Sequence, residues 1–220
     1  MTSSGGKTKQ TGTTGGLRER KKQQTYETVS ELAIALFLEK GFEKVSVAEV
    51  AAAADISKPT LFRYFATKED LVLHRFADHE DEPARVVTAR AAGHSALDAL
   101  EHHFLDGLTR RDPVTGLNDA DGVLAFHRLL YGTPSLVARL YGYQDRSEQA
   151  LAAALSNAHG GTPLEARIAA AQIVAVQRIL AGENWRRITA GESAAEAAPD
   201  AAKAAAEAFT QLRTGLRRYA

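Results

Sequence analysis

The segment at 42–71 has the sequence FEKVSVAEVAAAADISKPTLFRYFATKEDL, in which two helix starts follow each other closely. Ser46 precedes Glu49 by three residues, the spacing of a capping box, and apolar residues at helical spacing follow. Ser57 begins another short helix with Pro59 in its first turn, where the missing N–H of proline has little effect. The segment therefore predicts two short helices joined by a tight turn.

The second of these helices has two different faces. Leu61 and Phe65 are four residues apart, so they share one face and can pack on the preceding helix. Thr60 and Arg63 point roughly the opposite way. A pair of helices of this kind sets the second one in the major groove of DNA, whose width of ~12 Å admits one helix. The segment thus predicts a helix-turn-helix that binds DNA.

Helical patterns continue on both sides of this segment. Apolar residues at helical spacing predict a helix over 22–40, with Gly41 as the residue that ends it. Downstream, Thr67 and Asp70 form another capping pair and open a fourth helix. We therefore expect a small helical head at 17–67.

The same residues resemble the DNA-binding head of the TetR family of transcriptional regulators. The resemblance covers about residues 18 to 72 and includes the order Thr-x-x-x-Tyr-Phe-x-x-Lys-x-x-Leu, which begins at Thr60. It implies a homodimer that binds a palindromic double-stranded DNA operator, usually as a repressor. It also implies that a small-molecule effector binds the helical body and releases the protein from DNA.

The resemblance assigns roles by position. Ser46 would cap the second helix and touch a phosphate, and Arg63 would contact a base or a phosphate. Phe62 would meet a thymine methyl group, and Tyr64 and Lys68 match phosphate-contacting positions. The full set of residues expected to contact DNA is Ser46, Lys58, Pro59, Thr60, Phe62, Arg63, Tyr64 and Lys68. One departure is the turn residue Asp55, where many relatives carry glycine; aspartate tolerates a left-handed backbone better than most residues.

The N-terminal residues differ in composition from the head. Residues 1–16 are rich in glycine and lack apolar periodicity, which predicts a flexible tail. Four basic residues follow it, and they form either an arm that reaches the DNA backbone or minor groove, or a solubilising helix start. They are Arg18, Arg20, Lys21 and Lys22.

Composition excludes several classes of function. Lys plus Arg and Asp plus Glu are 27 each, so any basic surface must be local. The chain has no cysteine, which excludes disulfides, thiolate zinc sites and cysteine nucleophiles. No apolar run is long enough for a membrane span, so we expect a soluble cytoplasmic protein that needs no membrane. The adjacent His102 and His103 lack a partner at metal-binding spacing, and we expect no metal, no cofactor and no catalytic residues.

The remainder, 68–220, is predicted to be a larger helical body for effector binding and dimerisation, so the fold class is all-α. Helices are expected near 95–111, 120–131, 134–158, 163–190 and 200–219, whereas the acidic run before Pro83 is expected to break the helical pattern. The last two helices are expected to form the dimer interface through their apolar faces, whose members are Ile168, Ala171, Gln172, Ala175, Ile179, Phe209, Leu212 and Leu216.

A polar and aromatic set in this body suggests an effector pocket, because ligand pockets combine apolar walls with a few polar groups. The set is His127, Arg128, Tyr131, Tyr141 and Trp185. Ordinary core and rim packing explains these residues about as well, and Trp185 also fits a dimer interface. If they form a pocket, we expect an apolar ligand with a polar or anionic group near His127 or Arg128.

The sequence therefore favours a ligand-released transcriptional repressor. One alternative is a helix-turn-helix protein with a structural role or control by a partner protein. A helical enzyme with a DNA-binding appendage is a third, less favoured possibility, because the chain has no serine elbow, paired carboxylates or metal motif.

Overall fold

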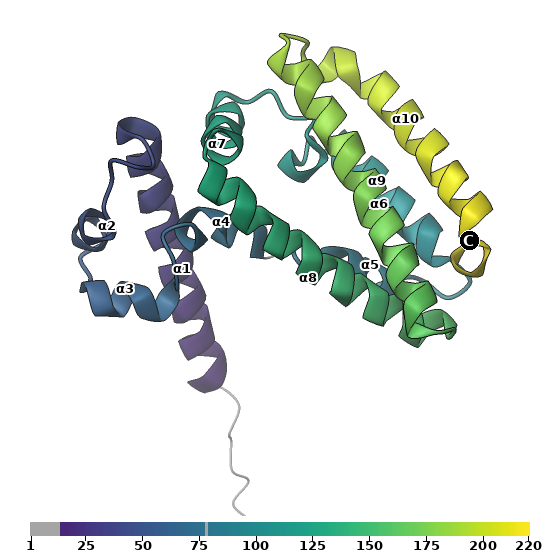
Figure 1. Cartoon of the computed structure of the whole chain (residues 1–220), viewed down its shortest axis with the longest axis horizontal. Helices are drawn as coiled ribbons and strands as arrows, with labels where there is room; N and C mark the ends of the chain where they lie inside the picture. Colours follow the sequence, from purple (N-terminus) through teal and green to yellow (C-terminus); the bar gives the residue numbers. More distant parts are fainter. Residues whose placement is uncertain (1–13, 78) are drawn as a thin grey trace, which may run out of the picture. The chain divides into compact units, whose positions relative to one another are not determined.

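The structure is a computed structural model that describes residues 14–77 and 79–220. Within these ranges it contains ten α-helices, two short 3-10 helices and no strand, which confirms the all-α prediction (Figure 1). The chain forms two compact units, of which the first ends at His74 and the second runs from Arg75 to Ala220. Each unit is described separately below.

The first unit contains the predicted helix-turn-helix. Its helices are α1 (Thr14–Lys40), α2 (Val47–Ala53), α3 (Lys58–Tyr64) and the first turns of α4 (Asp70–Ala77). Helix α1 begins before the predicted start at residue 22, so the last three residues of the predicted tail belong to it. Residues 1–13 lie outside the described residues, and a tail there stays a prediction.

The core of the first unit joins all four helices. Val29, Ala33 and Phe37 of α1 are buried, as are Val50 of α2 and Leu61 of α3. The hydroxyl of Ser30 in α1, itself buried, donates a hydrogen bond of 2.7 Å to the carbonyl of Leu71 in α4. Of the four consecutive alanines at 51–54, only Ala51 is buried in this core.

The second unit contains six whole helices. They are α5 (Glu82–Ala89), α6 (Ala96–Thr109), α7 (Asp121–Gly132), α8 (Pro134–His159), α9 (Pro163–Thr189) and α10 (Ala194–Gly215), with 3-10 helices η1 (Pro113–Thr115) and η2 (Arg217–Tyr219). Helix α5 was not predicted: Pro83 stands in its first turn, where proline is tolerated, and does not break it. Helix α10 also starts earlier than predicted, because Ser193 and Glu196 form a capping box and Pro199 is accommodated inside the helix.

Helix α9 lies at the centre of the packing in the second unit. It packs against α8 and α10, while α6 packs against α10 and α5 against α8 (Figure 1). Alanines let these helices approach closely, since Ala169, Ala170, Ala197, Ala201 and Ala205 are all buried. Phe209 and Leu212, which were expected to face a second protomer, fill this core instead. They are therefore unavailable to a dimer partner.

Candidate DNA-binding face and body cavity

The two short helices of the head are fixed at their N-termini by side-chain caps. In α2 the Ser46 hydroxyl accepts from the backbone N–H of Glu49 at 3.2 Å, and the Glu49 carboxylate accepts from the N–H of Ser46 at 2.7 Å. This reciprocal pair also holds the pKa of Glu49 below its usual value. In α3 the Ser57 hydroxyl accepts from the N–H of Thr60 at 3.2 Å. The predicted capping role of Ser46 is confirmed.

The turn between α2 and α3 has a defined geometry. The N–H of Ile56 donates to the carbonyl of Ala51 at 3.0 Å, and that of Asp55 to the carbonyl of Ala52 at 3.2 Å. These are the two hydrogen bonds of a Schellman motif, which requires a left-handed residue at its centre. Asp55 occupies that position with φ of 53°. Aspartate thus takes the place of glycine without loss of the motif.

One face of α3 is anchored and the other is open. Leu61 is only 1 % exposed and holds the helix on the core, whereas Lys58, Pro59, Phe62 and Arg63 are exposed. Phe62 is 44 % exposed, and the Lys58 ammonium lies 5.9 Å from the centroid of its ring. The open face therefore offers two cations and an aromatic ring on a rigid helix.

Tyr64, at the end of α3, belongs to an aromatic cluster. Its ring meets that of Tyr26 edge to face at a centroid distance of 5.0 Å, and Tyr26 stacks on His74 at 5.0 Å. The Lys22 ammonium lies 5.9 Å from the Tyr26 ring, and Arg20 is exposed. The cluster thus connects the start of α1, which carries the predicted arm, to the end of α3. The side chains of Arg18 and Lys21 lie outside the described residues.

Lys68, which precedes α4, is partly buried in the first unit. Its ammonium donates to the carbonyl of Phe42 and lies 4.3 Å from the Phe42 ring centroid and 5.5 Å from that of Phe37. These contacts hold the loop before α2 against the start of α4. Lys68 therefore has a structural role, and the predicted phosphate contact is a further role that remains to be tested.

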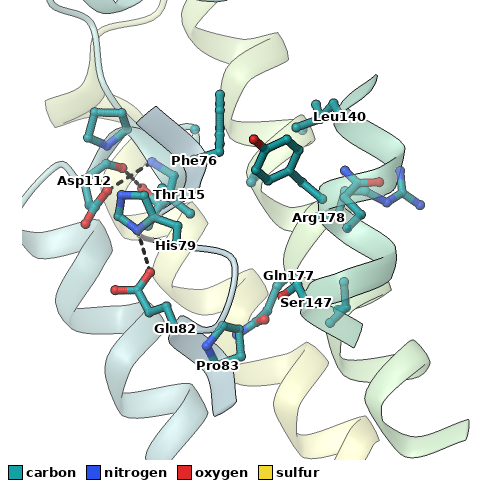
Figure 2. A pocket seen from close by; sticks show the side chains of 18 of the residues that line it. Phe76, His79, Glu82, Pro83, Asp112, Thr115, Leu140, Ser147, Gln177 and Arg178 are labelled. Carbon is teal, nitrogen blue, oxygen red and sulfur yellow. Dashed lines mark hydrogen bonds and ion pairs between the residues drawn. The ribbon is translucent and has the colours of Figure 1, made fainter. Parts of the chain in front are cut away.

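The second unit contains a cavity of about 440 Å³ (Figure 2). This volume lies within the ~300–1,000 Å³ range of small-molecule sites. Residues of α4 to α9 and of η1 line it, and the six aromatic residues among them are Phe76, Phe104, Tyr131, Tyr141, Tyr143 and Trp185. The walls are thus mainly apolar, with polar groups at a few places.

Two carboxylates at the cavity wall are already paired. Glu82 accepts at 2.7 Å from the ring of His79 and lies 3.3 Å from Nε2 of His103, and these two partners hold the pKa of its carboxyl well below the usual range. Figure 2 shows the His79 and Glu82 side chains pointing toward each other. Glu80 forms two contacts of 2.9 Å with the guanidinium of Arg146. Neither carboxylate lacks a partner.

His127 is a buried residue of the cavity wall with one ring nitrogen that makes no hydrogen bond. It is 8 % exposed, and its Nδ1 has no hydrogen-bond partner. Its ring lies 4.2 Å from that of Trp185 and 5.6 Å from that of Tyr131, centroid to centroid. Burial lowers the pKa of His127 to about 4, so the imidazole is neutral at physiological pH.

The η1 segment closes one side of the cavity and is locked onto α9. The buried side-chain amide of Asn184 donates to the carbonyl of Thr115 at 2.9 Å. Gly116 follows with φ of 73°, and a Cβ there would lie 2.0 Å from the carbonyl oxygen of Ala181. Only glycine allows so close an approach, so this position fixes the distance between η1 and α9.

Comparison with known proteins agrees with the geometry of the head. Residues 30–74 match the model of bacterial regulatory proteins of the tetR family. The chain is 35 % identical over 137 residues to the transcriptional regulator TcmR of Streptomyces glaucescens. The head of the chain is therefore that of a TetR-family regulator. That alignment covers 61 % of this chain and 58 % of TcmR, so the chain spans less than two thirds of this relative.

Two solved structures are similar in fold to most of this chain. A regulator from Mesorhizobium loti has a TM-score of 0.55 at 19 % identity, with 88 % of this chain and 96 % of that one covered. NalD of Pseudomonas aeruginosa, the secondary repressor of the MexAB-OprM multidrug efflux pump, has a TM-score of 0.54 at 16 % identity and covers 85 % of this chain and 97 % of its own. At such identities the likeness extends to the fold alone.

The structure brings most of the predicted pocket residues together. His127, Tyr131, Tyr141 and Trp185 all line the cavity. Arg128 does not: it is exposed on α7, because consecutive helical residues point about 100° apart and His127 faces inward. The cationic residue that does line the cavity is Arg178 of α9, which is itself exposed.

Sequence reasoning missed the histidine and glutamate group at the cavity wall. Its members are His79, Glu82 and His103. The spacing of the first two, three residues apart, was visible, but the helix that carries Glu82 was not predicted. Across residues 14–77 and 79–220 no group of three or more His, Cys, Asp or Glu is arranged to hold a metal ion. In the same ranges no helix is long and apolar enough to cross a membrane.

Proposed function

We propose that this chain is a DNA-binding transcriptional repressor that inserts α3 into the major groove. The observation that carries the proposal is the open face of α3, on which Lys58, Phe62 and Arg63 are exposed while Leu61 anchors the helix. In this arrangement the N-terminal end of α3 enters the groove, with Lys58, Pro59 and Thr60. Arg63 contacts a base or a phosphate. Ser46, Tyr64 and Lys68 contact phosphates on either side.

The repressor acts as a two-fold dimer, because a palindromic operator presents two equal half-sites. An exposed apolar stripe on α9 supports this proposal: Leu164 is 65 % exposed, Ile168 50 % and Ile179 60 %. Gln172 and Ala175 continue the stripe at helical spacing. The interface thus uses α9 and not α10, because the apolar residues of α10 fill the chain's own core.

Sedimentation tests the dimer. The full chain is expected to be a dimer at micromolar concentration, and Ile168→Glu to be a monomer, because it places a charge in an apolar interface. Thr214→Glu, at an exposed position of α10, serves as the control and is expected to stay dimeric. A monomeric wild-type chain, or loss of the dimer in both variants, would contradict this assignment.

A small molecule in the cavity releases the repressor from DNA. The cavity of about 440 Å³ supports control by a small molecule over control by a partner protein. Helix α4 is the covalent route of communication, because Asp70 to His74 belong to the first unit and Phe76, which lines the cavity, to the second. A coupling of ~1–3 kcal/mol would change DNA affinity about 5- to 150-fold.

Selection of DNA from a pool of random duplexes tests the DNA-binding proposal. The full chain is expected to enrich a palindromic sequence, which then serves as the operator in binding measurements. Arg63→Ala is expected to weaken operator binding by at least tenfold. Arg128→Ala is the matched control, since it removes an exposed arginine from the body, and is expected to leave affinity unchanged. Failure to enrich any sequence, or an equal loss in both variants, would refute the proposal.

A further inference from the structure

The first turns of α1, residues 14–25, project from the head and are called the α1 extension below. The helix begins at Thr14, and Val29 is the first of its described side chains to be buried. At a rise of ~1.5 Å per residue, about 18 Å of helix precedes Tyr26. Figure 1 shows this part of α1 reaching past α3. The extension adds little to the core of the head, so either a solubilising role or a binding role remains for it.

The α1 extension is strongly basic. It contains one acidic residue, Glu19, and the four basic residues Arg18, Arg20, Lys21 and Lys22. The chain as a whole has a formal net charge of zero, so positive charge is concentrated here. Arg18 and Lys22 are four residues apart, as are Lys22 and Tyr26, and positions at this spacing share one face of a helix. A basic stripe thus runs along α1 up to Tyr26.

This stripe ends beside the last residue of α3. The exposed Lys22 has its ammonium 5.9 Å from the centroid of the Tyr26 ring. Tyr26 meets Tyr64 edge to face at 5.0 Å and Phe65 edge to face at 5.2 Å. Two rings from the end of α3 therefore fix the place where the stripe ends. With α3 in the major groove and Tyr64 on a phosphate, the stripe continues from that phosphate onto the duplex outside the half-site.

The helical form of the extension decides which part of the duplex it contacts. An α-helix with its side chains is ~10–12 Å across, whereas the minor groove is ~6 Å wide. The extension is too wide to enter that groove in the manner of an extended arm. Lysine and arginine side chains on a helix that lies outside the grooves contact phosphate oxygens. The backbone contact is thus favoured over the minor-groove contact.

We propose that the α1 extension is a second DNA contact, in which Arg18 and Lys22 bind backbone phosphates of the duplex that flanks each half-site. This inference rests on the proposed function, because it takes α3 to be bound in the major groove. Phosphate contacts carry no sequence information directly, so the extension adds affinity without changing the operator preference. Each phosphate that it neutralises releases counterions and raises the slope of log affinity against log salt by ~0.9.

Fluorescence anisotropy with two lengths of the selected operator tests the flanking contact. The short duplex ends at the outer base pair of each half-site, and the long duplex continues on each side by one helical turn of ~10 base pairs. The full chain is expected to bind the long duplex at least ~10-fold more tightly at low salt, with a salt slope steeper by about two per protomer. Equal affinities for the two duplexes would refute the contact and favour the solubilising role.

Two double variants assign the contact to the stripe. Arg18→Ala with Lys22→Ala removes two cations and keeps a high helix propensity, and is expected to abolish the advantage of the long duplex while affinity for the short duplex stays unchanged. Arg128→Ala with Lys203→Ala is the matched control, because it removes the same charge from exposed positions of the body, and is expected to keep the advantage. An equal effect of the two double variants would contradict the proposal.

The composition of the flanks separates the two modes of contact. Long duplexes with flanks of A·T pairs alone and of G·C pairs alone are expected to bind equally, because phosphates are the same in both. Tighter binding to A·T flanks would place the extension in the minor groove and overturn the inference. A chain that enriches no operator would refute the proposed function and this inference with it, whereas operator binding that ignores flank length would refute this inference alone.

Discussion

Replacement of Gly116 by alanine is expected to loosen the wall of the cavity. The residue has φ of 73°, and an added Cβ would lie 2.0 Å from the carbonyl oxygen of Ala181 and 3.1 Å from the backbone nitrogen of Trp185. The left-handed conformation costs alanine ~1–2 kcal/mol, and overpacking adds ~1–3 kcal/mol. We therefore expect Gly116→Ala to reduce the free energy of unfolding by ~2–5 kcal/mol, measured by urea denaturation.

Gly93 offers a matched control for this prediction. It also has a left-handed backbone, with φ of 87°, but nothing lies within 4 Å of a Cβ built there. Gly93→Ala therefore carries the conformational cost alone, ~1–2 kcal/mol, and the difference between the two variants isolates the contact of η1 with α9. Equal losses in the two variants would refute the close approach. The Gly116 variant is also expected to weaken ligand binding, because η1 lines the cavity.

Three further predictions follow from the site geometry. Lys68→Ala is expected to weaken binding to all DNA sequences alike and to lower the slope of log affinity against log salt by about one, whereas a changed base preference with an unchanged slope would contradict a phosphate contact. Thr60→Ala is expected to relax the preference at one base pair, which a repeat of the DNA selection would reveal. Because burial lowers the pKa of His127 from 6.5 to about 4, the unfolded chain takes up this proton first, and stability relative to His127→Phe is expected to fall as the pH drops from 6.5 to about 4. The fall is at most ~3 kcal/mol in urea denaturation across that window, and a flat difference would contradict it.

The head was predictable because its determinants are local. Capping pairs such as Ser46 with Glu49 act over three residues, and the structure forms both hydrogen bonds of that pair. The turn residue Asp55 adopts the left-handed backbone that the sequence implied. By contrast, the contact of Lys68 with the carbonyl of Phe42 joins residues 26 positions apart, and no local pattern indicates it.

The body was less predictable because packing between distant helices decides it. The apolar faces of α9 and α10 were visible in the sequence, but whether a face meets a partner or the chain's own core depends on the neighbouring helices. Phe209 thus lies in the core, whereas Ile168 and Ile179 remain exposed. The acidic run before Pro83 predicts a break because its charges dominate the local pattern, yet one turn later Val87 packs against the core and α5 forms.

The cavity combines a feature that the sequence indicates with contacts that only the fold provides. His127 and Trp185 lie 58 residues apart in the sequence and 4.2 Å apart as rings, a proximity that only the fold provides. The types of residue indicated a pocket. Which arginine lines it, Arg178 and not Arg128, depends on the direction in which each helix faces, and the sequence does not show that direction.

A footprint on the selected operator tests the central claim most directly. If α3 of each protomer lies in the major groove, hydroxyl-radical cleavage and methylation protection by the full chain are expected to reveal two equal protected patches. Their centres are expected to be ~34–36 Å apart, or a multiple of that distance, related by the two-fold symmetry of the sequence. Arg63→Ala is expected to abolish both patches at the wild-type concentration. A single patch, protection confined to the minor groove, or a footprint that survives this substitution would contradict the account.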